Sequence, residues 1–170
     1  TPADIEAAKA GAPVQRASWG LFDKRFDVSV EPREANRFGW IVEVDPFDPT
    51  AAPIKRTALG RFRHEAATPV VNPDGRVVVY LGEDRAWGYV FRFVSRGRFD
   101  EAAGVANGRL LDDGVLSVAR FSDDALTWVP LILGQNGLTA ANGFETEADI
   151  LIDTRRAAQA AGGTPMDRPE

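Results

Sequence analysis

The fold class is decided by residues 70–81, which read VVNPDGRVVVYL. Asn72 can bond its own backbone at the first position of a turn, Pro73 fixes φ at the second, and Gly75 suits the fourth. The valine-rich residues on either side of the turn are typical of β-strands. This stretch therefore predicts two antiparallel strands joined by a tight turn.

Working outward, further short stretches of alternating or continuous apolar residues also predict strands. With the hairpin included, the predicted strands span residues 38–44, 55–62, 66–71, 76–81, 89–94, 115–121 and 126–133. Turn signals separate them about every 8 to 15 residues, a spacing typical of antiparallel sandwiches, barrels and propellers. The predicted fold class is all-β. Residues 19–22 are expected to enter the first sheet as a buried segment, and residues 3–9 to form a helical turn or two.

One α-helix is predicted over residues 146–161. Thr146 and Asp149 have the spacing of a capping box, in which each side chain bonds the other residue's backbone. Apolar or small residues then recur at helical spacing, and the Gly162-Gly163 pair supplies the stop. A helix among strands is typical of an insertion over one end of the sheets, where site walls are found.

Composition excludes several classes of protein. The chain has 170 residues, of which 44% are hydrophobic, and this content excludes a disordered chain. A net charge of −5 argues against a nucleic-acid surface, and no apolar run approaches the roughly 20 residues that span a bilayer. With no Cys and one His, thiolate and multi-histidine metal sites are excluded within these residues. Apart from His64, any metal ligand here must be an oxygen.

The two ends give no information on export. Residue 1 is not Met, and the composition does not change toward residue 170. We therefore expect both ends to be cuts within a longer chain, so that the missing signal peptide excludes no compartment.

Four short charged segments are candidates for chemistry. They are residues 36–40, 61–67, 81–84 and 167–170. Taken singly, each is also typical of a solvated strand end or a polar loop, and His64 is typical of a hydrogen-bonded wall residue. Residue spacing alone therefore predicts a soluble all-β protein with several candidate acids.

Taken together, four strings resemble the PhoX-type alkaline phosphatases, in the same order and with similar gaps. They are NRFGWIVEVDPFDP at 36–49, KRTALGRFRHE at 55–65, DGRVVVYLGED at 74–84, and the segment 154–170 that ends in MDRPE. The resemblance runs from about residue 19 to residue 170. Several unrelated strings in sequence are far more specific than one motif.

This resemblance implies a β-propeller of antiparallel four-stranded blades with a metal site at one end of its channel. Its members are monomeric phosphomonoesterases that use calcium and iron and are exported through the twin-arginine route to the periplasm or beyond. Their chains are several times longer. The resemblance therefore implies an interior fragment of about two blades plus the helical insertion, inactive alone because other blades complete the metal cluster.

The resemblance also implies roles for individual residues. Glu65 and Glu170 fall on metal-binding glutamates, Arg168 falls on an arginine that contacts phosphate, and Asp84 is a weaker metal candidate in an acidic pair that also fits a turn. The family's iron-ligating cysteine has no counterpart here. Carboxylates suit calcium and ferric iron, and a guanidinium can hold two phosphate oxygens of a small phosphomonoester.

Two other functions remain open at this point. A calcium-dependent lactonase-type propeller would also place carboxylates at the channel, but it would have less need of Arg168. A non-enzymatic β-propeller repeat protein would leave the same acids solvated.

Overall fold

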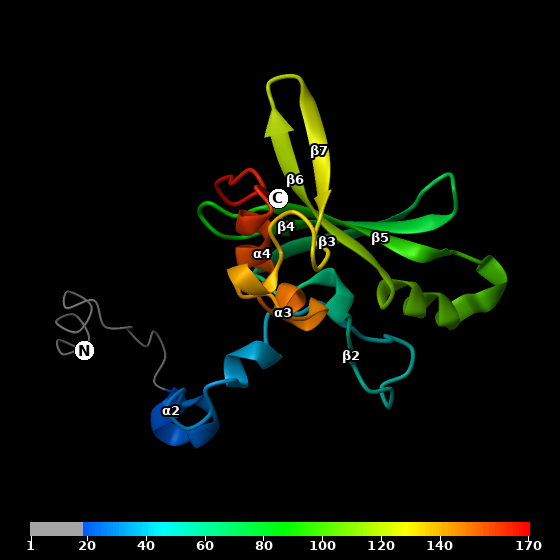
Figure 1. Ribbon diagram of the computed structural model, residues 1–170. Coiled ribbons are helices and arrows are strands. Elements are labelled where there is room, and N and C mark those ends of the chain that lie inside the picture. The colour runs from blue at the N-terminus through cyan, green and yellow to red at the C-terminus, as the bar shows by residue number, and fades with distance from the viewer. Residues whose placement is uncertain (1–18) are drawn as a thin grey trace. The chain divides into compact units, whose positions relative to one another are not determined.

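The computed structural model describes residues 19–170, which belong to two compact units with a boundary between Phe38 and Gly39 (Figure 1). The first unit contains a short helix, α2 (Trp19–Phe22), and two 3-10 helices, η1 (Lys24–Phe26) and η2 (Glu34–Arg37). The expected strand entry at residues 19–22 is wrong: this segment is helical, and Trp19 and Phe22 are 65% and 89% exposed. The helical turn predicted at residues 3–9 lies outside the described residues.

The second unit is built on one antiparallel sheet in which each strand pairs with the next along the chain. Its strands are β3 (His64–Val71), β4 (Arg76–Glu83), β5 (Val90–Arg98), β6 (Gly114–Ser122) and β7 (Ala125–Pro130). The turn predicted between β3 and β4 is present, because the Gly75 N–H donates to the Asn72 carbonyl at 2.8 Å and Gly75 has φ 83°. The predicted antiparallel, mostly β architecture is confirmed.

The strands predicted at 38–44 and 55–62 are much shorter than expected. Only β1 (Val42–Glu43) and β2 (Ile54–Lys55) form, paired as a separate two-stranded ladder. A 3-10 helix, η3 (Thr57–Leu59), follows β2. The Arg61 N–H then donates to the Leu151 carbonyl at 2.9 Å, so this backbone bonds to the helical region instead of to a sheet.

The predicted helix is present but divided. It forms as α3 (Glu147–Ile152) and α4 (Thr154–Ala160), interrupted at Asp153, and the Thr146 capping box is present. Directly after the break comes Thr154, whose hydroxyl donates to the Leu151 carbonyl at 2.8 Å. Gly162 has φ 73°, and the left-handed stop is therefore confirmed.

The hydrophobic core lies between one face of the sheet and these two helices (Figure 1). Along the middle of the central strands alternate residues are buried on this face, and the helices contribute small and branched side chains. The members include Leu81, Phe91, Phe93, Leu116, Val118, Ile150, Ala157 and Ala158. This packing fixes α4 over the sheet. From the end of α4 the chain continues to residues 166–170.

A long connection, which sequence patterns do not predict, joins β5 to β6. It is the 3-10 helical segment η4 (Glu101–Leu111), kinked at Gly104 with φ 50°. The Asp100 side chain accepts from the Ala102 N–H at 3.0 Å and so caps its start. β5 begins at Val90 and ends at Arg98, and η4 follows this second end of the strand.

The capping box predicts an acid-sensitive contribution to stability. Hydrogen bonds from the Thr146 hydroxyl and backbone lower the pKa of Asp149. Its contribution is therefore present above its unfolded pKa of about 3.9 and lost as pH falls through the lower folded value. Asp149→Asn should lower the Tm at pH 7, and the difference from wild type should be smaller at about pH 3, below the unfolded pKa.

Thermal unfolding followed by circular dichroism checks this, with Asp124→Asn as the matched control. Asp124 is an exposed acid in the turn between β6 and β7, so its replacement should leave the Tm unchanged at both pH values. An equal loss of Tm for Asp149→Asn at pH 7 and at about pH 3 would contradict the assignment.

Candidate functional site

The predicted site residues gather where β3 begins and β4 ends, which we call the β3–β4 end. Here His64 pairs with Glu83 and Ala66 pairs with Gly82, so that Glu65 is the extra residue of a β-bulge. A bulge can redirect a side chain out of the strand's ordinary alternation. Glu65 was expected just before a strand and lies inside it, at this bulge.

Asp84 is held at the same place by the first residues before β3. Its N–H donates to the Arg63 carbonyl at 2.8 Å, and its carboxylate lies 3.7 Å from the Arg63 guanidinium. Asp84 is half-buried, and the neighbouring acid, Glu83, is 2% exposed. The acidic pair therefore divides into one buried acid and one that reaches solvent.

The C-terminal segment returns to this end and pairs with the loop after β4. The Met166 N–H donates to the Gly88 carbonyl at 2.8 Å, and the Arg168 N–H donates to the Arg85 carbonyl at 3.1 Å. Arg168 has φ 46°, an uncommon backbone conformation for a residue other than glycine. These two hydrogen bonds bring Arg168 to the β3–β4 end.

Glu170 reaches the same place because Gly82 has no side chain. A Cβ built on Gly82 would lie 2.1 Å from the Pro169 carbonyl oxygen and 3.3 Å from the Glu170 Cα. The backbone of residues 169–170 therefore lies in direct contact with β4 at Gly82, the residue that pairs with Ala66. The structure therefore brings Glu65, Asp84, Arg168 and Glu170 to one end of the sheet.

The chemical groups gathered here are exposed and of both signs. Glu65, Arg168 and Glu170 are exposed, as are two basic residues that were not predicted as site residues: Arg63, within the charged segment 61–67, and Arg85. Among residues 19–170, no group of three or more His, Asp and Glu side chains is arranged to hold a metal ion. The β3–β4 end can thus supply carboxylate oxygens and guanidinium groups, without forming a complete ion site among these residues.

His64 is a wall residue of this region. Its ring packs on Phe62 at 3.7 Å between centroids, and its Nε2 lies 3.1 Å from the Gly60 carbonyl oxygen. Burial lowers the pKa of His64 to about 4. The imidazole is therefore neutral at pH 7, which agrees with the hydrogen-bonded role predicted for it.

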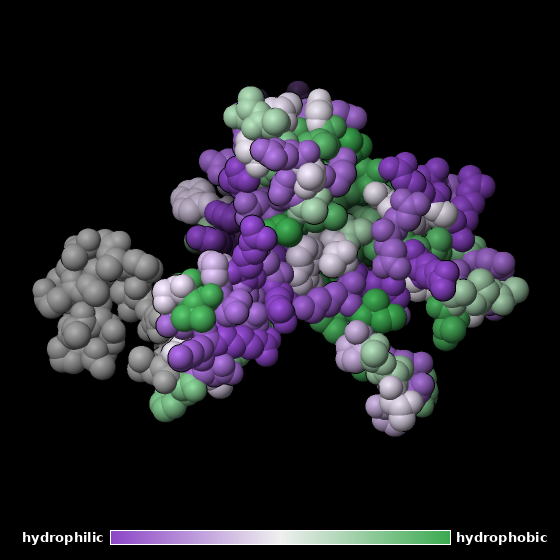
Figure 2. All heavy atoms as spheres, turned by 60° about the horizontal axis from the view of Figure 1, so that its bottom comes forward, coloured by the Kyte–Doolittle hydropathy of each residue, from purple (hydrophilic) through white to green (hydrophobic). Residues whose placement is uncertain are grey.

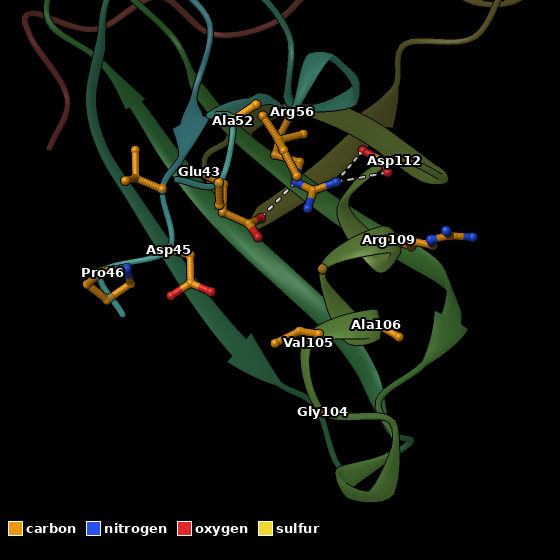
Figure 3. A pocket seen from close by; sticks show the side chains of 14 residues that line it. Glu43, Asp45, Pro46, Ala52, Arg56, Gly104, Val105, Ala106, Arg109 and Asp112 are labelled. Atoms are coloured by element: carbon orange, nitrogen blue, oxygen red, sulfur yellow. Dashed lines mark hydrogen bonds and ion pairs between the residues drawn. The ribbon is translucent and has the colours of Figure 1, made fainter. Parts of the chain in front are cut away.

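A groove of about 830 Å³ lies elsewhere in this unit, between the β1–β2 ladder and η4 (Figure 3). On one side of it the 4%-exposed Arg56 bonds Glu43 at 2.7 Å and Asp112 at 2.8 and 2.9 Å. Hydrogen bonding to Glu43 is the main cause of the raised pKa of Arg56. Arg56 therefore stays protonated, and its charge is balanced by the two carboxylates. None of the predicted site residues lines the groove.

Apolar side chains also reach the surface of this unit. Phe47 and Val105 are 94% and 92% exposed. Figure 2 shows one face on which hydrophobic patches alternate with hydrophilic ones. Isolated exposed apolar residues are ordinary on protein surfaces, so they identify no site by themselves.

Comparison with known proteins gives one family and one close structural match. The family model described as "Alkaline phosphatase PhoX" matches residues 4–170. A solved structure, Pseudomonas fluorescens PhoX in complex with vanadate, a transition state analogue, is 45% identical, with a TM-score of 0.88. The match covers 92% of this chain and 29% of that one. No curated protein matches.

Proposed function

The chain belongs to the PhoX alkaline phosphatase family, and from this membership we propose that it is part of a metal-dependent phosphomonoesterase. The complete enzyme would release phosphate from organic phosphoesters. The observation that carries the proposal is the 45% identity over 92% of the chain to a PhoX that binds vanadate, a transition-state analogue. The proposal concerns the complete enzyme, because this chain spans 29% of that structure's length.

The β3–β4 end supplies groups that suit this reaction. Arg168 would hold two oxygens of the phosphoryl group with its planar fork, and the exposed Arg63 and Arg85 add positive charge beside it. Arg168 is connected to Glu170 through one residue, Pro169, whose φ is fixed by its ring. The chain would thereby hold a phosphate contact and a metal ligand in a fixed relation.

The donor set fits the metals that we propose, calcium and iron. Glu65 and Glu170, with Asp84 as a weaker candidate, offer carboxylate oxygens, which bind calcium and ferric iron. The bound cations would neutralise charge that develops on the phosphoryl group. Since residues 19–170 hold no complete cluster, further ligands must come from elsewhere in the complete enzyme, and the isolated chain should be inactive.

We propose that this chain forms about two blades of a larger β-propeller, with α3 and α4 as the helical insertion. The sheet ends in two edge strands, β3 and β7, and open edges are usually paired or covered. The blades and the edge strands do not require a second copy of the protein, so this arrangement fits a monomeric enzyme. The acidic composition gives no reason to expect nucleic acid as a partner.

For localisation, we propose the periplasm or the outside of the cell, after twin-arginine export. The support is the family alone. Among the described residues, none of the helices has the length and apolar character needed to cross a membrane.

An assay of the complete enzyme tests the function together with Arg168. It should hydrolyse p-nitrophenyl phosphate and not a simple lactone, and prolonged chelation should abolish turnover. Arg168→Lys should lower kcat/KM for the phosphate ester about 30-fold, or about 2 kcal/mol, because an ammonium cannot replace the bidentate fork.

The matched control is Arg96→Lys, which alters an exposed arginine paired with Asp113 at 3.0 Å, away from the β3–β4 end. It should leave kcat/KM unchanged. Lactone hydrolysis that is insensitive to Arg168→Lys would support a lactonase instead. A protein that turns over neither substrate and retains no metal after dialysis would support a non-enzymatic propeller.

A further inference from the structure

Glu83 is a buried acid that the proposed chemistry does not use. It is the last residue of β4 and is 2% exposed. Its Oε2 accepts from the Arg155 guanidinium at 3.0 Å and from the Tyr89 N–H at 3.2 Å. Its own N–H donates to the Tyr89 carbonyl at 3.1 Å. Glu83 therefore closes the loop 84–88 at its base with both side chain and backbone.

Arg155 connects this loop to helix α4. Its side chain is 31% exposed, and its guanidinium lies 5.6 Å from the centre of the Tyr89 ring. The pair thus joins an element packed on the core to the base of the loop. Removing Arg155 would leave the buried Glu83 carboxylate uncompensated, and removing Glu83 would free the Arg155 guanidinium from the loop, so both members should matter.

The loop closed by Glu83 is the one on which the C-terminal segment rests. Within it, the Gly88 N–H donates to the Arg85 carbonyl at 2.9 Å. The carbonyls of Gly88 and Arg85 in turn accept from Met166 and Arg168. A Cβ on Gly88 would lie 2.6 Å from the Glu83 carbonyl oxygen, so the loop is tightly closed. A movement of the loop would move Arg168.

We propose that Glu83 and Arg155 are positioning residues, which hold loop 84–88 so that Arg168 faces the phosphate. The inference rests on the proposed function, in which Arg168 contacts phosphate. Neither residue touches the substrate in this account. Their effect is transmitted through the two backbone hydrogen bonds that Met166 and Arg168 donate to the loop.

The first test measures competitive inhibition by inorganic phosphate in the complete, metal-loaded enzyme. Glu83→Ala and Arg155→Ala should each raise the Ki for phosphate about tenfold. Glu83→Gln, which keeps an acceptor of the same shape, should raise it less than about threefold. The control is Glu43→Gln, which disturbs the Arg56 ion pair near η4 and should leave Ki unchanged even if the Tm falls.

The second test is amide hydrogen exchange across residues 164–170, which reports the segment directly without activity. Exchange should be at least about tenfold faster in Glu83→Ala and Arg155→Ala than in wild type or Glu43→Gln. Unchanged exchange together with an unchanged Ki would overturn the proposal while leaving the phosphatase function intact. If the wild-type enzyme lacked phosphatase activity, the proposed function would fail, and an unchanged exchange rate would overturn the positioning role separately.

Discussion

Replacing Gly82 with alanine is expected to lower kcat/KM for p-nitrophenyl phosphate at least about 100-fold in the complete enzyme. The new Cβ would lie 2.1 Å from the Pro169 carbonyl oxygen, a separation that no folded protein tolerates. β4 cannot give way, because it is paired with β3 on one side and β5 on the other. The 169–170 backbone must therefore move, and Arg168 and Glu170 move with it.

The matched control is Gly97→Ala, in the neighbouring strand β5. There the new Cβ would meet only the Leu110 Cδ2, at 2.7 Å, and this is the end of a flexible side chain. We expect less than a threefold change in kcat/KM for this control. Wild-type kcat/KM in Gly82→Ala would show that the 169–170 segment does not take part in the site.

The strands β3 to β7 could be predicted from the sequence because their signals are local. The turn at 72–75 and the alternating or valine-rich runs specify hairpins between neighbours in the chain. The strand predicted over residues 55–62 is much shorter than expected, because the partner of this backbone is not local in sequence. The Arg61 N–H finds its acceptor at Leu151, and local pattern does not reveal a partner so distant in sequence.

The resemblance predicted which residues form the site, whereas only the structure shows that they lie together at the β3–β4 end. The bulge that singles out Glu65 depends on the pairing register with β4, which the sequence of one strand does not determine. The approach of residues 169–170 to Gly82 depends on how α4 leaves the core. Sequence patterns singled out Glu83 and Asp84 together, and only burial in the structure distinguishes the buried Glu83 from the half-buried Asp84.

We propose that Glu65 and Glu170 both bind metal in the complete enzyme. Neutral amides of the same shape are poor ligands for a cation held by carboxylates, so Glu65→Gln and Glu170→Gln should each remove bound metal. Because the cations stabilise charge in the transition state, kcat should fall at least about 1000-fold, or about 4 kcal/mol. Glu101→Gln, an exposed acid at the start of η4, is the matched control.

The most direct measurement is therefore metal content per chain, by elemental analysis of the purified complete enzyme. We expect Glu65→Gln and Glu170→Gln each to lose at least about one equivalent of calcium or iron relative to wild type and Glu101→Gln, with turnover of p-nitrophenyl phosphate lost in parallel. Full metal content and full turnover in either glutamine variant would contradict the role assigned to that glutamate.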